Sequence, residues 1–345
     1  MMKKIAQTVF GQLQTALATA TLPLALVTLT PAVVHAAQFS NLYVFGDSLS
    51  DVGQFSAVTG GLVPPASLGY FDGRFSNGPV WVDYLATELG VPSTTQTNFA
   101  IGGASTGTQN SSIPGLPGLQ QEIAGFTLTV PQADPDALYV IWAGANDYLG
   151  TIGQTNPTIP VSNIDQAITA LAQVGAKDIL VANLPDLGLV PLVSDRGPIV
   201  ANAASALAQA HDTLLAQSLA SLSSQLSPQG VTLIPFDVNS VFNGIAANPA
   251  QYGITNVTDP CLVNSPLFFS SGAISVCSNP DEYLFWDSLH PSTAAHQIVA
   301  DAAFKTISGS VAGVPEPPTT AGLVVVGAFF AGLTALKQKR NHAPR

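Results

Sequence analysis

Val44-Phe45-Gly46-Asp47-Ser48-Leu49-Ser50-Asp51-Val52-Gly53 is the segment on which the organisation of this chain depends. The apolar run from Leu42 to Phe45 indicates a buried strand, and Gly-Asp-Ser then indicates a tight turn into a helix N-terminus. A serine there has its hydroxyl lifted off the strand end, with backbone N–H groups beside it. These features favour a nucleophile with an adjacent oxyanion site. The alternative is a serine that only caps a helix, so the assignment depends on partners downstream.

Strand-like and helix-like segments alternate over residues 38–313. The further apolar runs that predict strands are Thr97–Ala104, which two glycines interrupt, Ala137–Trp142, Lys177–Ala182 and Val231–Phe236. The helical patterns are Pro79–Leu89, Ile164–Gly175, Ile199–Leu226 and Thr293–Ile307. This alternation predicts one α/β domain with a parallel sheet covered on both faces. Polar residues follow the strands, at the edge where open α/β sheets bind ligands.

A second polar motif, Asp287-Ser-Leu-His290-Pro, lies near the end of this domain. An aspartate three residues before a histidine, in a loop followed by a helix, can hold the imidazole and fix its tautomer. His211 lies in the middle of a predicted helix, where a solvated or structural role is expected. His296 lies inside the last helix and suits packing or hydrogen bonding. The histidines and acids show no metal-ligand spacing, so neither a metal nor a cofactor is expected.

Both ends of the chain have the composition of targeting segments. Residues 1–37 combine Lys3 and Lys4 with an apolar stretch and a small-residue end, the pattern of a secretory signal peptide. An uncleaved N-terminal anchor helix is the alternative. Residues 314–345 resemble a PEP-CTERM sorting tail: Val-Pro-Glu-Pro-Pro, an uncharged run at 319–336 and a basic end. An ordinary tail anchor is the alternative.

These ends predict an exported protein of the bacterial cell envelope or the extracellular medium, with or without retention in the membrane by the tail. Its expected partners are the membrane, through that tail, and the export and sorting machinery. Residues 38–313 hold four basic and twenty acidic side chains, which argues against nucleic acid as a partner. In an oxidising compartment Cys261 and Cys277 suit a disulfide worth about 3 kcal/mol. A free cysteine pair is the alternative.

Four motifs in order resemble those of the GDSL-type (SGNH) esterase/lipase family, over residues 40–308. They are Gly46-Asp-Ser48-Leu-Ser-Asp51, Asn98-Phe-Ala-Ile-Gly-Gly103-Ala104, Gly144-Ala-Asn146-Asp147 and Asp287-Ser-Leu-His290-Pro. The resemblance implies a flavodoxin-like three-layer α/β/α sandwich around a parallel five-stranded sheet. It implies Ser48 as the nucleophile, His290 as the general base and then general acid, and Asp287 as the residue that orients His290.

The resemblance also implies an oxyanion hole formed by the backbone N–H groups of Ser48 and Gly103 and the side-chain amide of Asn146. Gly102 is the alternative backbone donor. The implied activity is hydrolysis of carboxylic esters, of lipid or short acyl type, through an acyl-enzyme on Ser48. Polysaccharide deacetylation and thioester cleavage are alternatives, because a fold does not fix a substrate. A non-catalytic envelope or matrix protein is a further rival, which the presence of every site residue disfavours.

Overall fold

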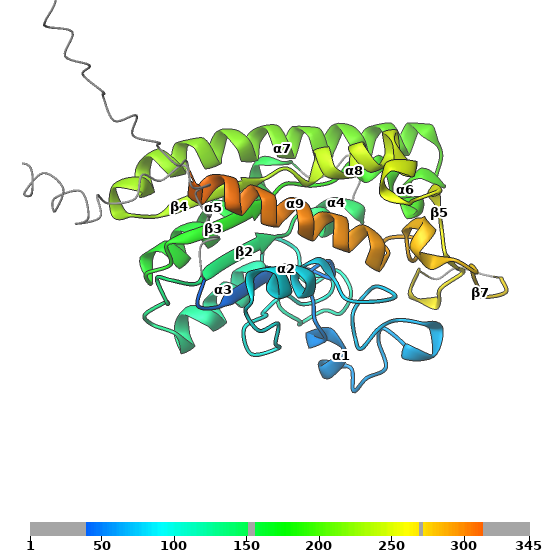
Figure 1. Cartoon of the computed structure of the whole chain (residues 1–345), viewed down its shortest axis with the longest axis horizontal. Coiled ribbons are helices and arrows are strands. Elements are labelled where there is room, and N and C mark those ends of the chain that lie inside the picture. Colours follow the sequence, from blue (N-terminus) through cyan, green and yellow to red (C-terminus); the bar gives the residue numbers. More distant parts are fainter. Residues whose placement is uncertain (1–38, 151–155, 269–271, 313–345) are drawn as a thin grey trace, which may run out of the picture. The chain divides into compact units, whose positions relative to one another are not determined.

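A sheet of parallel strands forms the centre of the computed structural model, which describes residues 39–150, 156–268 and 272–312 (Figure 1). The regular strands are β1 (Leu42–Gly46), β2 (Leu138–Trp142), β3 (Asp178–Ala182) and β4 (Thr232–Phe236). They pair in the order β1-β2-β3-β4, with Leu42 opposite Leu138 and Asp178 opposite Thr232. The predicted parallel α/β sheet is therefore confirmed, with four regular strands.

The prediction of a fifth regular strand at Thr97–Ala104 is wrong. Residues 97–101 lie beside β1 and form backbone hydrogen bonds of 2.7–3.0 Å to it, but only an isolated bridge results. The outer edge of this segment bonds side chains instead of another strand, since Gln54 Nε2 donates to the Asn98 carbonyl at 2.5 Å. When this segment is counted as a strand at the edge beside β1, the five strands lie in the 2-1-3-4-5 order of flavodoxin-like folds.

Helices cover both faces of the sheet, because alternate strand residues point in opposite directions. Val140 and Trp142 of β2 pack in one core cluster, whereas Tyr139 and Ile141 pack in the other. The first cluster includes α2 (Trp81–Leu89), α8 (Val238–Ala247) and α9 (Thr293–Ala312). The second includes α3 (Leu119–Thr129), α5 (Thr158–Gln173) and the later turns of α7 (Pro198–Leu226). Together the two faces form the expected three layers.

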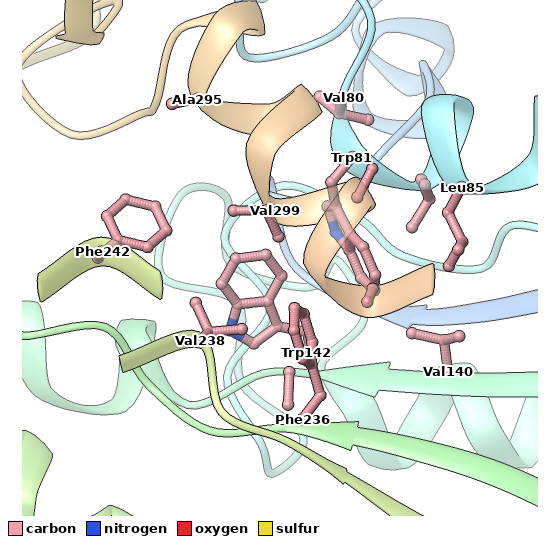
Figure 2. Packing of buried hydrophobic residues seen from close by; sticks show 14 of the residues in the cluster. Val80, Trp81, Leu85, Val140, Trp142, Phe236, Val238, Phe242, Ala295 and Val299 are labelled. Atoms are coloured by element: carbon pink, nitrogen blue, oxygen red, sulfur yellow. The ribbon is translucent and has the colours of Figure 1, made fainter. Parts of the chain in front are cut away.

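Figure 2 shows the first core cluster at the point where helices meet strands. Trp81 of α2 lies with its ring centroid 5.5 Å from that of Trp142 at the end of β2, in an edge-to-face arrangement. Val299 of α9 and Phe242 of α8 point toward the same core. This packing fixes the carboxyl end of β2 against α2, α8 and α9. Trp81 therefore belongs to the core.

The remaining elements are short. The short α-helices are α1 (Gln54–Val58), α4 (Ala145–Leu149) and α6 (Pro191–Ser194). The 3₁₀ helices are η1 (Ala66–Leu68), η2 (Leu187–Leu189), η3 (Ser227–Gln229), η4 (Pro249–Tyr252), η5 (Pro266–Phe268) and η6 (Pro280–Glu282). The small strands are β5 (Asn256–Pro260), β6 (Leu262–Val263), β7 (Ser275–Val276) and β8 (Tyr283–Phe285), paired β5 with β8 and β6 with β7.

The segment between β5 and β8 is closed by a disulfide that joins Cys261 to Cys277. The signal peptide expected at 1–37 and the tail expected at 314–345, with its apolar run at 319–336, lie outside the described residues. Within residues 39–312, apart from the gaps at 151–155 and 269–271, none of the helices has the length and apolar character that crossing a membrane requires.

Candidate active site

Ser48 lies in a tight turn directly after β1. Gly46 has a φ of +148°, and a Cβ atom there would meet the carbonyl oxygen of Trp142 at 2.1 Å, so only glycine fits. The Ser50 N–H donates to the Asp47 carbonyl at 3.0 Å and closes the turn. The next helix begins only at Gln54. The expectation that the turn leads directly into a helix N-terminus is therefore wrong, because hydrogen-bonded turns separate Ser48 from α1.

The structure brings Ser48, His290 and Asp287 into one hydrogen-bonded row. Ser48 Oγ lies 2.9 Å from His290 Nε2, and His290 Nδ1 lies 2.8 Å from Asp287 Oδ2. All three side chains are buried, and Ser48 is the most exposed of them at 8%. This geometry pairs a nucleophile with a base, and the base with a carboxylate that orients it.

The loop between β8 and α9 positions the acid and the base. Asp287 is fully buried, and its Oδ1 accepts the N–H groups of Leu289 at 2.8 Å and His290 at 2.7 Å. These bonds turn the loop back on the carboxylate and place the imidazole three residues on against it. The rings of Phe75 and Phe268 flank the imidazole, with centroids 5.0 and 6.0 Å away. The ring is thus held by apolar contacts on its faces and by hydrogen bonds at its edges.

The candidate backbone donors of an oxyanion hole, the N–H groups of Ser48, Gly102 and Gly103, differ in whether they already donate a hydrogen bond within the protein. The Gly102 N–H donates to Asp51 Oδ2 at 2.9 Å, so this donor is occupied. Among the described residues, the N–H groups of Ser48 and Gly103 have no hydrogen-bond partner. Gly103 has a φ of +81°, and a Cβ there would meet Ser112 Oγ at 2.3 Å. Of the two candidate glycines, the geometry therefore favours Gly103 as the donor.

Asn146 is the second residue of α4, and its amide is held from both sides. Ser111 Oγ donates to Asn146 Oδ1 at 3.0 Å, and Asn146 Nδ2 donates to the Ala104 carbonyl at 3.1 Å. The other contact of Nδ2 is a long one, 3.4 Å to Asp47 Oδ2. One amide hydrogen is thus only weakly bonded on the side of the Ser48 turn, where an oxyanion would need a donor.

Buried carboxyl groups of Asp47, Asp51 and Glu122 lie at the Ser48 turn, and of these Glu122 is not predicted from the sequence. Glu122 of α3 is 4% exposed, and its Oε2 accepts the Gly46 N–H at 2.8 Å, whereas its Oε1 has no partner among the described residues. Burial raises the pKa of Asp47 to about 7 and that of Asp51 to about 6, and it raises the pKa of Glu122 well above its usual range. The sequence signal for Glu122 is an acidic residue at helical spacing among the apolar residues Leu119, Ile123 and Phe126.

Glu122→Gln is expected to stabilise the protein at alkaline pH. Because the pKa of Glu122 is raised in the folded state, its contribution to stability is present in acid and is lost as the pH rises above the unfolded value of about 4.3. Glutamine can still accept the Gly46 N–H and never ionises. The free energy of unfolding from urea titrations should rise by about 1–3 kcal/mol at pH 8 and stay unchanged at pH 4.

A matched control for this variant is Glu282→Gln, at an exposed position. It should show no pH-dependent gain. A gain for Glu122→Gln that is the same at pH 4 and pH 8, or a loss that grows with pH, would contradict the assignment of a buried neutral carboxyl.

A pocket opens beside Ser48 and His290, and most of its lining is apolar. Its apolar residues are Leu49, Ala145, Leu149, Pro185, Leu187, Leu189, Val190, Phe242, Phe285, Leu289 and Pro291. Its polar residues are Asp47, Ser48, Asn146, Asp186 and His290. None of the described residues of the loops at 62–76 and 106–118 or of the 261–277 segment is part of this lining. The lining comes from the turn after β1, from α4, from the loop after β3 with η2, from α8, and from β8 with the loop that follows it.

The other two histidines of the domain are buried and have hydrogen-bond partners outside this row. His211 Nδ1 lies 2.9 Å from Tyr148 Oη, and burial lowers the pKa of His211 to about 4. The Trp81 N–H donates to His296 Nδ1 at 3.2 Å, and burial lowers the pKa of His296 to about 3. Both are structural, and the solvated alternative for His211 is wrong. In the part of the chain that the structure describes, no cluster of His, Cys, Asp or Glu has a metal-site arrangement.

A Ser–His–Asp row at the carboxyl edge of a parallel α/β sheet is the arrangement of a serine hydrolase. The family profile for GDSL-like lipases and acylhydrolases matches residues 42–303, and the chain belongs to this family. It is a carboxylic ester hydrolase.

The chain is similar to two bacterial proteins along most of its length. It is 32% identical to a phosphatidylcholine-sterol acyltransferase of Aeromonas hydrophila, over 77% of this chain and 89% of that protein. It is 28% identical to a thermolabile hemolysin of Vibrio parahaemolyticus, over 76% of this chain and 63% of that protein. Among solved structures, a catalytic mutant of an acetylxylan esterase from Geobacillus stearothermophilus is 15% identical, with a TM-score of 0.42, over 77% of this chain and 93% of that one.

Proposed function

We propose that the protein hydrolyses esters of apolar acyl chains through an acyl-enzyme on Ser48. The observation that carries this proposal is the 2.9 Å contact between Ser48 Oγ and His290 Nε2 at the mouth of a largely apolar pocket. Burial of acyl methylene groups in such a pocket contributes about 0.8 kcal/mol for each group. A long acyl chain thereby gains binding that an acetyl group lacks.

In the first half-reaction, Ser48 Oγ attacks the ester carbonyl carbon while His290 Nε2 takes the hydroxyl proton. The negative charge that develops on the carbonyl oxygen is stabilised by the N–H groups of Ser48 and Gly103 and by Asn146 Nδ2. His290 then gives its proton to the departing alcohol, and the acyl group stays on Ser48. In the second half-reaction His290 takes a proton from water while the water oxygen attacks the acyl carbon. The bond from that carbon to Ser48 Oγ then breaks, His290 returns the proton to Ser48 Oγ, and the acid is released.

The proposal also places the protein outside the cytoplasm, in the cell envelope or the medium, with residues 1–37 as a signal peptide and 314–345 as a sorting tail. The Cys261–Cys277 disulfide supports an oxidising compartment. The membrane and the sorting machinery are then partners of the tail, and the ester substrate is the partner of the pocket.

The acyl preference is tested with a p-nitrophenyl ester series from acetate to palmitate, and with Leu189→Asp. Leu189 lines the pocket and is half-buried, so the added charge should lie where an acyl chain binds. We expect kcat/KM to rise with chain length in the native protein. For the longer esters Leu189→Asp should lose about tenfold or more, and for acetate little, because desolvating a carboxylate against a chain is costly.

The control for this experiment is Ile199→Asp, which adds the same charge at an exposed position on the neighbouring helix. It should leave the profile unchanged. Hydrolysis of acetate alone would shift the assignment to deacetylation of a polysaccharide. Faster cleavage of acyl thioesters than of matched oxygen esters would shift it to a thioesterase, and no hydrolysis of either would favour a binding protein.

A further inference from the structure

The Asp287 carboxylate has a hydrogen-bond partner that the three-residue row does not include. Tyr70, in the loop between η1 and α2, donates from Oη to Asp287 Oδ2 at 2.7 Å. The same oxygen lies 2.8 Å from His290 Nδ1. Tyr70 is 3% exposed, so water does not compete for this bond. Burial and the nearby Asp287 charge raise the pKa of Tyr70, so its hydroxyl stays protonated and can donate.

A second layer of contacts holds this tyrosine. Ser265 Oγ lies 3.2 Å from Tyr70 Oη. Because the single Tyr70 hydroxyl proton goes to the carboxylate, Ser265 donates to Tyr70. The Tyr70 ring packs edge-to-face on Trp286, with centroids 6.0 Å apart, and lies in one buried cluster with Cys261 and Leu262. Ser265 belongs to the segment that the Cys261–Cys277 disulfide closes.

We propose that Tyr70 is a positioning residue for the reaction, which acts through Asp287 by fixing the Oδ2 atom that His290 bonds. This inference rests on the proposed roles of Ser48 and His290. Asp287 Oδ1 accepts two backbone N–H groups and lies 3.0 Å from His290 Nδ1, whereas Tyr70 anchors Oδ2, the oxygen nearer to the imidazole, from outside the row. A charge-assisted hydrogen bond to a buried carboxylate is stronger than a neutral one. Among the described residues, its loss leaves the imidazole as the one partner of Oδ2.

The expected effect falls on turnover and not on substrate binding, because Tyr70 does not line the pocket beside Ser48. Tyr70→Phe keeps the ring and its packing and removes only the donor. We expect kcat to fall about 10- to 100-fold, the size of one charge-assisted hydrogen bond, with KM changed less than about twofold. Ser265→Ala, one step further away, should give a smaller loss in kcat in the same direction.

The matched control is Tyr139→Phe. Tyr139 is buried and donates from Oη to the Asp134 carbonyl at 2.9 Å, and it lies in the sheet away from the row. The Tyr139→Phe variant loses one hydrogen bond from a tyrosine hydroxyl, as Tyr70→Phe does, and its kcat should stay within about twofold of the native value. A second readout is the proton NMR signal of His290 Nδ1–H in the full-length protein. Tyr70→Phe should shift it, and Tyr139→Phe should not.

Ser48→Ala, measured alongside, separates failure of this inference from failure of the proposed site. If Ser48→Ala is inactive and Tyr70→Phe keeps full kcat, the inference is overturned. If the loss of activity in Tyr70→Phe is accompanied by a matching rise in KM and a fall in thermal stability, Tyr70 is merely structural. If Ser48→Ala stays active, the site itself is wrong. Should Tyr70→Phe not fold, Ser265→Ala decides: a lower kcat with a shifted NMR signal supports the inference, and unchanged values overturn it.

Discussion

Ser48→Ala is expected to lower kcat for ester hydrolysis by about a million-fold, the loss that removal of a triad nucleophile produces in serine hydrolases. Ser48 Oγ is the only hydroxyl that bonds His290 Nε2 in the described part of the chain, so no second nucleophile is aligned with the base. Without the hydroxyl no acyl-enzyme can form. Residual hydrolysis would come only from binding and the oxyanion donors.

The protein should remain folded when Ser48 is replaced, since among the described residues its side chain bonds only His290, and it fills little space. Thermal unfolding of Ser48→Ala should therefore match the native protein closely. Ser56→Ala, a half-buried serine on α1, is the control and should keep full activity. More than about 1% residual kcat in a folded Ser48→Ala protein would contradict the assignment of the nucleophile.

Asp287→Asn is expected to lower kcat by about ten-thousand-fold, although the loop geometry should persist. The backbone N–H groups of Leu289 and His290 require an acceptor at Oδ1, so the asparagine oxygen should take that place. The amide NH₂ would then face His290 Nδ1 and Tyr70 Oη, which both donate to the native carboxylate. The imidazole would lose its proton at Nδ1, carry it at Nε2 and be unable to accept the Ser48 proton.

Steady-state kinetics with p-nitrophenyl butyrate checks this prediction, and the pattern of the loss matters as much as its size. KM should change little, because Asp287 does not line the substrate pocket. Asp259→Asn, at an exposed position, serves as the control and should be fully active. A loss of less than about tenfold in Asp287→Asn would mean that Asp287 does not orient the base.

Most of the fold could be predicted because the strands of a parallel sheet are continuous apolar runs that need little tertiary information. β2, β3 and β4 lie within one residue of their predicted bounds. The segment 97–101 pairs with β1, but its outer edge bonds side chains such as that of Gln54 and it is not a regular strand. Bonds from residues distant in the sequence cannot be predicted from the local pattern. α8 is not among the predicted helices, although Asp237, directly after β4, is an N-cap signal for it and accepts the Ser240 N–H in the structure.

Part of the candidate site could likewise be predicted from local sequence, and part could not. Ser48, Asp287 and His290 carry local signals, a turn after a strand and an acid three residues before a histidine, so the sequence could propose them. The choice between Gly102 and Gly103 depends on which N–H Asp51 occupies, which requires coordinates. Tyr70 and Glu122 are far from the motifs in sequence and reach the site only through the fold.

Covalent labelling of the full-length protein with a fluorophosphonate tests the central claim most directly. The probe reports the event itself, because the serine oxygen bonds to phosphorus and fluoride leaves. Intact-mass and peptide analysis should show one adduct per chain, located on Ser48, absent from Ser48→Ala and formed slowly in Asp287→Asn. An adduct on another residue, or ester hydrolysis that continues without any labelling, would contradict an acyl-enzyme on Ser48.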